Sequence, residues 1–113
     1  MPTMTRPAMQ KGSRNVFRDL GFSAGAAEEL VAKSALIDAI SETIERSKLT
    51  QKAAAELCAI DQPTLSKVLR GAMESVTIDR LAAWLIALGR TVEIHVRPYN
   101  ARNKSGHLVV VVL

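Results

Sequence analysis

The order of apolar and polar residues over 50–71 predicts two short helices joined by a tight turn. Thr50 suits the N-cap of the first helix, because its hydroxyl can accept a hydrogen bond from a backbone N–H of the first turn. Asp61 can cap the second helix in the same way, and Pro63 follows in the first turn, where a missing N–H costs little. Gly71 comes directly after the second helix, where glycine commonly ends a helix.

The second predicted helix, residues 62–70, has one apolar face and one polar face. Leu65 and Val68 fall on the apolar side when they are placed at helical spacing. The opposite side has amide, hydroxyl and cationic groups and no carboxylate, a composition that suits a groove lined by phosphates. The residues of this polar face are Gln62, Pro63, Ser66, Lys67 and Arg70.

Helical periodicity also covers residues 26–46 and 77–88. In the first stretch the apolar residues lie near one stripe and the acids mostly on the other side, and the pattern fits either one long helix or a pair bent near Lys33. In the second stretch Thr77 is a candidate N-cap and Gly89 marks the end.

The period changes after the last helix. Residues 91–96 alternate between apolar and polar side chains, which predicts a β-strand, and residues 107–113 are a second strand candidate. Two strands are not stable alone, so either they form a hairpin on the helices or a strand pairs with its copy in another subunit. The expected fold is therefore mainly α, a small helical bundle with one C-terminal β-strand, or two, used in dimerisation.

Composition sets further limits. A chain of 113 residues forms one small domain with tails, and its net charge of +4 is compatible with a polyanionic partner. The charge is polarised: residues 28–46 have five acids and two bases, a net −3, whereas residues 48–70 have four bases and two acids, a net +2.

The single cysteine, Cys58, excludes an internal disulfide and fits a reducing compartment. No membrane span or signal segment is evident, so we expect a cytoplasmic protein.

The sequence contains few residues in arrangements that could support catalysis. His95 and His107 have no Cys, Asp or Glu at ligand spacing, and the chain has neither a glycine-rich phosphate loop nor a nucleophile motif. We therefore expect no enzyme, no metal site and no cofactor.

Residues 50–71 resemble the helix-turn-helix of the Cro/C1-type (XRE) repressors, which implies a lambda-repressor-like fold. Gln51 opens the motif, Leu65 and Val68 stand at its apolar anchor positions, and Gly71 is the stop. Ala59 departs from the family pattern, because glycine usually occupies this turn position; an alanine held at positive φ there costs about 1 kcal/mol.

The resemblance extends outward from this motif. Residues 15–22, the acidic helix after them and residues 88–94 are similar to HigA-like antitoxins. The implied organisation is a flexible basic arm over 1–14, a helix-turn-helix DNA-binding domain with an N-terminal helical extension and a C-terminal strand over 15–97, and a turn with a second strand or tail over 98–113.

The two faces of the second helix predict how the protein binds duplex DNA: this helix enters the major groove while the first crosses the backbone. Gln62 is the best base reader, since its amide can pair with adenine N6 and N7, and Lys67 can reach guanine O6 and N7 or a phosphate. Gln51 matches the family position that holds a phosphate. The expected DNA contacts are Gln51, Lys52, Gln62, Pro63, Thr64, Ser66, Lys67 and Arg70, among which Lys52 and Arg70 are expected to contact phosphate.

One subunit reads only a few base pairs, so we expect a homodimer on a palindromic operator, with the two recognition helices about 34 Å apart. The candidate dimer surface consists of Trp84, Leu88, Val92, Ile94 and Val96.

The antitoxin resemblance implies that the protein neutralises a toxin, a RelE-like ribosome-dependent RNase, and represses its own operon. Candidate toxin-binding residues are Phe17, Phe22, Glu28 and Glu29. The alternatives are a stand-alone XRE-type repressor of phage or metabolic type, and a protein-interaction module that has lost DNA binding.

Overall fold

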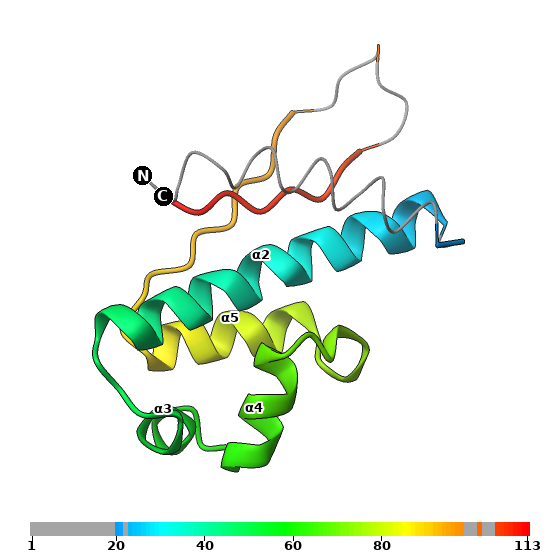
Figure 1. Ribbon diagram of the computed structural model, residues 1–113. Coiled ribbons are helices and arrows are strands. Elements are labelled where there is room, and N and C mark those ends of the chain that lie inside the picture. Colours follow the sequence, from blue (N-terminus) through cyan, green and yellow to red (C-terminus); the bar gives the residue numbers. More distant parts are fainter. Residues whose placement is uncertain (1–19, 22, 99–101, 103–105) are drawn as a thin grey trace.

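A computed structural model describes residues 20–21, 23–98, 102 and 106–113 (Figure 1). In this part of the chain the elements are α2 (Ala24–Arg46), α3 (Gln51–Leu57), α4 (Gln62–Leu69), the short 3-10 helix η2 (Met73–Ser75) and α5 (Ile78–Ala87). Figure 1 shows α2 and α5 side by side, running in the same direction, with α3 and α4 packed below them. The helix pair predicted over 50–71 is thus confirmed as α3 and α4.

Each α-helix of the described chain, α2 to α5, begins at a side-chain cap. The Thr50 hydroxyl accepts from the backbone N–H of Ala53 at 3.0 Å, and the Thr77 hydroxyl accepts from that of Arg80 at 3.3 Å. Asp61 caps α4 in the same way, and Ser23 caps α2. Each cap satisfies an N–H group that has no partner within its own helix, so polar residues of the sequence fix where these helices start.

The helix ends and the central turn depend on residues with positive φ. Gly71 and Gly89, at φ 108° and 95°, follow α4 and α5 as expected for glycines that end helices. Ala59, between α3 and α4, has φ 57°, which confirms that the turn holds an alanine in the left-handed region. A Cβ is disfavoured in that region, so the turn forms at a local cost of about 1 kcal/mol.

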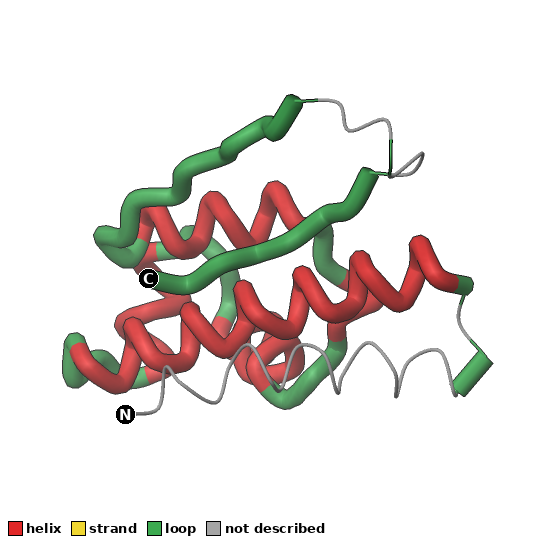
Figure 2. Tube along the Cα trace, turned by 90° about the horizontal axis from the view of Figure 1, so that it is seen from above, coloured by secondary structure: helices red, strands yellow, loops and turns green. Residues whose placement is uncertain are grey.

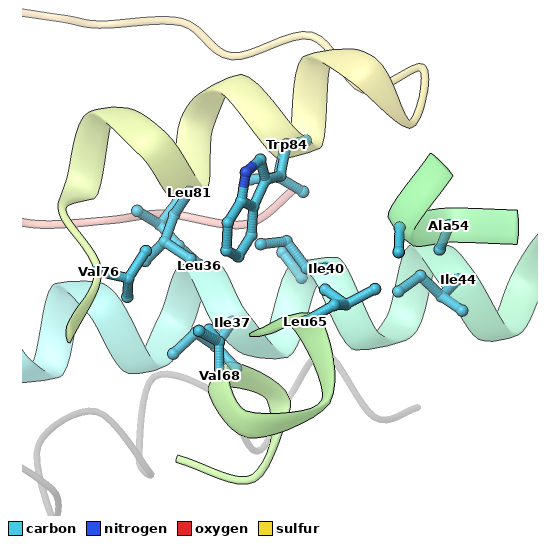
Figure 3. Packing of buried hydrophobic residues seen from close by; sticks show 13 residues of the cluster. Leu36, Ile37, Ile40, Ile44, Ala54, Leu65, Val68, Val76, Leu81 and Trp84 are labelled. Atoms are coloured by element: carbon cyan, nitrogen blue, oxygen red, sulfur yellow. The ribbon is translucent and has the colours of Figure 1, made fainter. Parts of the chain in front are cut away.

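The core lies where α4 and α5 meet α2. Ile40 of α2, Leu65 of α4 and Leu81 of α5 are among its fully buried side chains (Figure 3). Ala54 and Ala55 are also buried, and their small size lets α3 approach the other helices closely.

A polar contact ties the end of α5 to α2. The buried Thr43 hydroxyl donates to the Ala39 carbonyl at 2.6 Å and accepts from Arg90 Nη1 at 3.0 Å. Both the donor and an acceptor site of this hydroxyl are therefore used, as a buried polar group requires.

Of the two interpretations of residues 26–46, the single long helix is correct, because α2 is continuous past Lys33. The Lys33 side chain is buried, and its Nζ lies 3.1 Å from Glu29 Oε2, one helical turn earlier. This pairing lets the helix carry a cation at a covered position.

The predicted C-terminal strands are wrong. The described chain is all-helical, and residues 91–96 and 107–113 form no strand in it. Instead, the segment 106–113 runs over α2 and α5 (Figure 2), with Val110 and Val112 packed against the core. Its backbone is held by a carboxylate, since Leu108 N donates to Glu28.

The strand prediction is wrong because an alternating pattern does not by itself require a sheet. Alternation needs only that every second side chain be covered, and an extended segment lying on helices meets that need without a ladder of strand hydrogen bonds. Val92 likewise packs on the core, whereas Ile94 and Val96 remain exposed.

In the part of the chain that the structure describes, no helix has the length and apolar character needed to cross a membrane.

Ala59→Gly should stabilise the fold by up to about 1 kcal/mol, because glycine relieves the left-handed turn while adding some freedom to the unfolded chain. The matched control is Ala53→Gly, the same change inside α3, which should instead cost about 1 kcal/mol. Denaturant unfolding of both variants checks this, and destabilisation by Ala59→Gly would contradict it.

Candidate nucleic-acid interface

The turn between α3 and α4 is held from both sides. Cys58 N donates to the Ala54 carbonyl and Ile60 N to that of Ala55, each at 3.0 Å. The partly buried Cys58 thiol faces the Trp84 carbonyl, with an Sγ–O distance of 3.8 Å, and burial raises its pKa. The turn therefore contacts α5 and fixes the angle at which α4 leaves it.

The anchoring of α4 determines which side it presents. Leu65 and Val68 are 0% and 2% exposed, and Figure 3 shows both side chains directed into the core. Gln62, Pro63 and Lys67 are exposed on α4. The predicted polar face is thus on the outside of the molecule.

The remaining predicted contacts lie around this face. Ser66 and Thr64 are half-buried on α4, and Arg70 is exposed directly after it. Gln51 and Lys52 are exposed in the first turn of α3.

Asp61 places a carboxylate at the start of α4, where it serves the helix. Its oxygen accepts from Thr64 N at 3.1 Å. Hydrogen bonds from the side chain and then the backbone of Thr64 lower the pKa of this carboxyl. Asp61 is therefore ionised at neutral pH and engaged in capping.

A groove beside α4 was not expected from the sequence. It has a volume of about 290 Å³ and lies between α4, η2 and the start of α5; we call it the α4–α5 groove. Lys67 and Arg80 are its two cations, and the Arg80 guanidinium carbon lies 5.7 Å from the centroid of the Trp84 ring. The lining residues are Pro63, Thr64, Lys67, Val68, Ser75, Val76, Arg80 and Trp84.

Sequence reasoning missed Arg80 because it treated 77–88 only as an amphipathic core helix. The signal was the i, i+4 spacing of Arg80 and Trp84, which brings a cation over an aromatic ring on one helical face.

Comparisons with known proteins agree with this geometry. A family model described as a helix-turn-helix domain matches residues 16–97. A solved structure named "Putative XRE Family Transcriptional Regulator" is 33% identical, with a TM-score of 0.70, and the match covers 78% of this chain and 99% of that one. No curated protein sequence matches the chain significantly.

This chain belongs to the XRE-type helix-turn-helix family. As a member of that family, it is a DNA-binding transcription regulator.

In this XRE-type protein the five residues predicted for dimerisation divide into two groups. Trp84 is only 4% exposed and belongs to the chain's own core, and Leu88 and Val92 pack partly against that core. Ile94 and Val96 are 87% and 91% exposed, so these two lie on the surface.

The residues predicted for toxin binding are also separated. Phe17 and Phe22 lie outside the described residues. Glu28 Oε2 lies 3.0 Å from His107 Nδ1, and Glu29 is paired with Lys33. Both carboxylates therefore have partners inside the chain. Among the described residues, no group of three or more His, Cys, Asp or Glu could hold a metal ion.

Gln62→Ala should relax discrimination at one base pair by about 1–3 kcal/mol per half-site, because it removes the only amide exposed on α4. Affinities for the natural operator and for single-base variants of it check this. A uniform loss on every sequence would make Gln62 a backbone contact instead.

Lys67→Ala should weaken binding to the operator and lower the salt slope by about 1 per subunit, because it removes an exposed cation from the polar face. Titrations over a range of salt concentrations check this, and unchanged binding would contradict the role of Lys67.

Proposed function

We propose that this regulator is a sequence-specific repressor that binds a palindromic operator as a homodimer. The observation that carries the proposal is the outer face of α4. Gln62 and Lys67 are exposed opposite a fully buried anchor, Leu65, and the one carboxylate within residues 61–70, that of Asp61, is engaged in capping. An amide and an ammonium group on an exposed helix can donate to the acceptors that base edges and phosphates present in a major groove.

The distribution of charge supports the same orientation on DNA. Residues 48–70, which include α3 and α4, have a net charge of +2, whereas residues 28–46 of α2 have −3. A polyanion is therefore attracted to the helix-turn-helix side of the molecule and repelled by the α2 side.

A second copy is needed for a useful operator. The eight residues of α4 span about 12 Å, enough for a few base pairs. Two-fold pairing would place two copies of α4 about 34 Å apart on successive major grooves. Ile94 and Val96 are our candidates for the dimer contact, since covering them would remove two of the most exposed apolar side chains from water.

We further propose that the repressor is the antitoxin of a type II toxin–antitoxin pair, which neutralises a RelE-like toxin and autorepresses its operon. The similarity of residues 15–22 and 88–94 to HigA-like antitoxins supports this role, and the acidic α2 side offers a surface for a basic partner.

One observation favours a second candidate, a stand-alone XRE-type repressor without a toxin. Glu28 and Glu29, two acids of the candidate toxin surface, are paired with His107 and Lys33 within the chain. A toxin that used these carboxylates would have to displace existing contacts within the chain.

The test is a titration of the full-length protein against its own upstream DNA and a random duplex, at two salt concentrations. We expect a preference for the upstream DNA that survives at the higher salt, because base contacts depend less on counterion release than phosphate contacts do. Equal, salt-sensitive binding to both duplexes would overturn the repressor proposal.

Expression of the intact operon separates the two candidate roles. A toxin that copurifies with the chain, and whose growth arrest the chain relieves, would support the antitoxin. An operon in which the chain represses transcription while no product binds it would favour the stand-alone repressor.

A further inference from the structure

The α4–α5 groove combines features that point to an anionic ligand. Its two charged lining residues, Lys67 and Arg80, are both cationic, and neither acid nor amide side chains line it. Val68, Val76 and Trp84 form its apolar floor and are all buried. Charges that sit above an apolar floor are less well hydrated than charges in open water, which strengthens their attraction for an anion.

Arg80 is held in place more firmly than an ordinary surface arginine. Its backbone N–H donates to the Thr77 cap in the first turn of α5, and its guanidinium lies over the Trp84 ring. The Trp84 ring is itself locked in the core beside Leu36 and Ile40 (Figure 3). An arginine stacked on a rigid ring loses less side-chain freedom when it binds a ligand.

The hydroxyl groups of the groove are neutral donors, and one of them already has a partner. The Ser75 hydroxyl donates to the Ala72 carbonyl at 3.0 Å, and Thr64 is half-buried. The strongest donors that the groove offers are therefore the ammonium group of Lys67 and the planar guanidinium of Arg80. A phosphate fits this pair. Its oxygens can accept two parallel hydrogen bonds from the planar guanidinium of an arginine, and they can also pair with the compact charge of a lysine ammonium group.

We propose that Arg80 and Lys67 together bind one phosphate of the DNA backbone, beside the half-site that α4 reads. The inference rests on the proposed function, since it takes α4 to lie in the major groove. Lys67 belongs to both the α4 face and the groove, so a backbone that passes α4 on this side meets Arg80 next. The contact sets the register of α4 on the duplex and extends the footprint beyond the helix-turn-helix.

Asp79 is the acid directly before Arg80 in the chain. Its pKa is lowered first by a hydrogen bond from the Thr77 side chain and, to a smaller extent, by the charge of Arg80. The Asp79 carboxylate does not line the groove. It reduces the net positive charge of the site without occupying it.

The test compares wild type, Arg80→Ala, Arg80→Lys and the control Arg97→Ala on the upstream DNA and on a random duplex over a range of salt concentrations. Arg97 is also exposed, and its segment lies on the side of the helices opposite α4 (Figure 1), so its loss makes the same change in net charge away from the groove. Thermal melts first establish that each variant folds.

For Arg80→Ala we expect affinity for both duplexes to fall by on the order of tenfold, and the salt slope to fall by about 1 per subunit. Arg80→Lys should retain the salt slope but recover only part of the affinity. Lysine keeps the positive charge but cannot donate the paired hydrogen bonds of the planar guanidinium. Arg97→Ala should bind like wild type. An Arg80→Ala protein with wild-type affinity and slope would overturn the inference.

Neutral methylphosphonate linkages, introduced one at a time along the upstream DNA, identify the phosphate. At one position per half-site the neutral linkage should weaken wild type clearly more than Arg80→Ala, in which only Lys67 still contacts that phosphate. At the other contacted positions it should weaken both proteins equally. The same sensitivity map for both proteins would overturn the inference. Loss of wild-type preference for the upstream DNA would instead reject the proposed repressor, and the effect of Arg80 on random duplex would still be measurable.

The single tryptophan separates DNA from a free phosphate compound, because Trp84 lines the groove and is the chain's only residue of that type. We expect its fluorescence to change on binding duplex in wild type and much less in Arg80→Ala. Inorganic phosphate alone should not saturate the change. Saturation at sub-millimolar phosphate would assign the groove to a free phosphate-bearing ligand and overturn the DNA contact.

Discussion

The burial of Leu65 and Val68 against α2 and α5 is the interaction on which the DNA-facing surface depends. Full burial of one such side chain stabilises a fold by about 1.5–3 kcal/mol, and these two residues occupy one side of a helix of only eight residues. Such a short helix is not stable in isolation. Its polar face is therefore presented rigidly only because its apolar face is held in the core.

The turn before α4 shows what this arrangement demands of the backbone. Ala59 adopts φ 57° because α3 and α4 must meet at an angle that places both Ala54 and Leu65 in one core. The hydrogen bonds of Cys58 N and Ile60 N to α3 carbonyls hold the chain in that conformation. Tertiary packing thus outweighs a local preference of about 1 kcal/mol.

Local rules predicted the helices because their determinants lie within a few residues of each other. Thr50, Asp61 and Thr77 each cap the N–H group three residues later, so sequence spacing alone locates these starts. The strand prediction for the C-terminal segments was wrong for the opposite reason. Whether 107–113 joins a sheet or lies on helices depends on distant partners such as Glu28, and the alternating pattern is the same in both cases. The α4–α5 groove is likewise non-local, since it needs η2 to bring Ser75 and Val76 beside α4.

Trp84 connects the stability of the fold to the proposed DNA contact. From the sequence it was a candidate for the dimer surface, because the last helix was expected to lie beside a dimerising strand at 91–96. In the structure one part of its ring fills the core beside Ile40, and its face supports the Arg80 guanidinium. Because the ring cannot move without disturbing the core, the position of Arg80 relative to Lys67 is set by the same packing that holds α4 in place. Reading of the bases by α4 and binding of the backbone at the groove therefore share one rigid support.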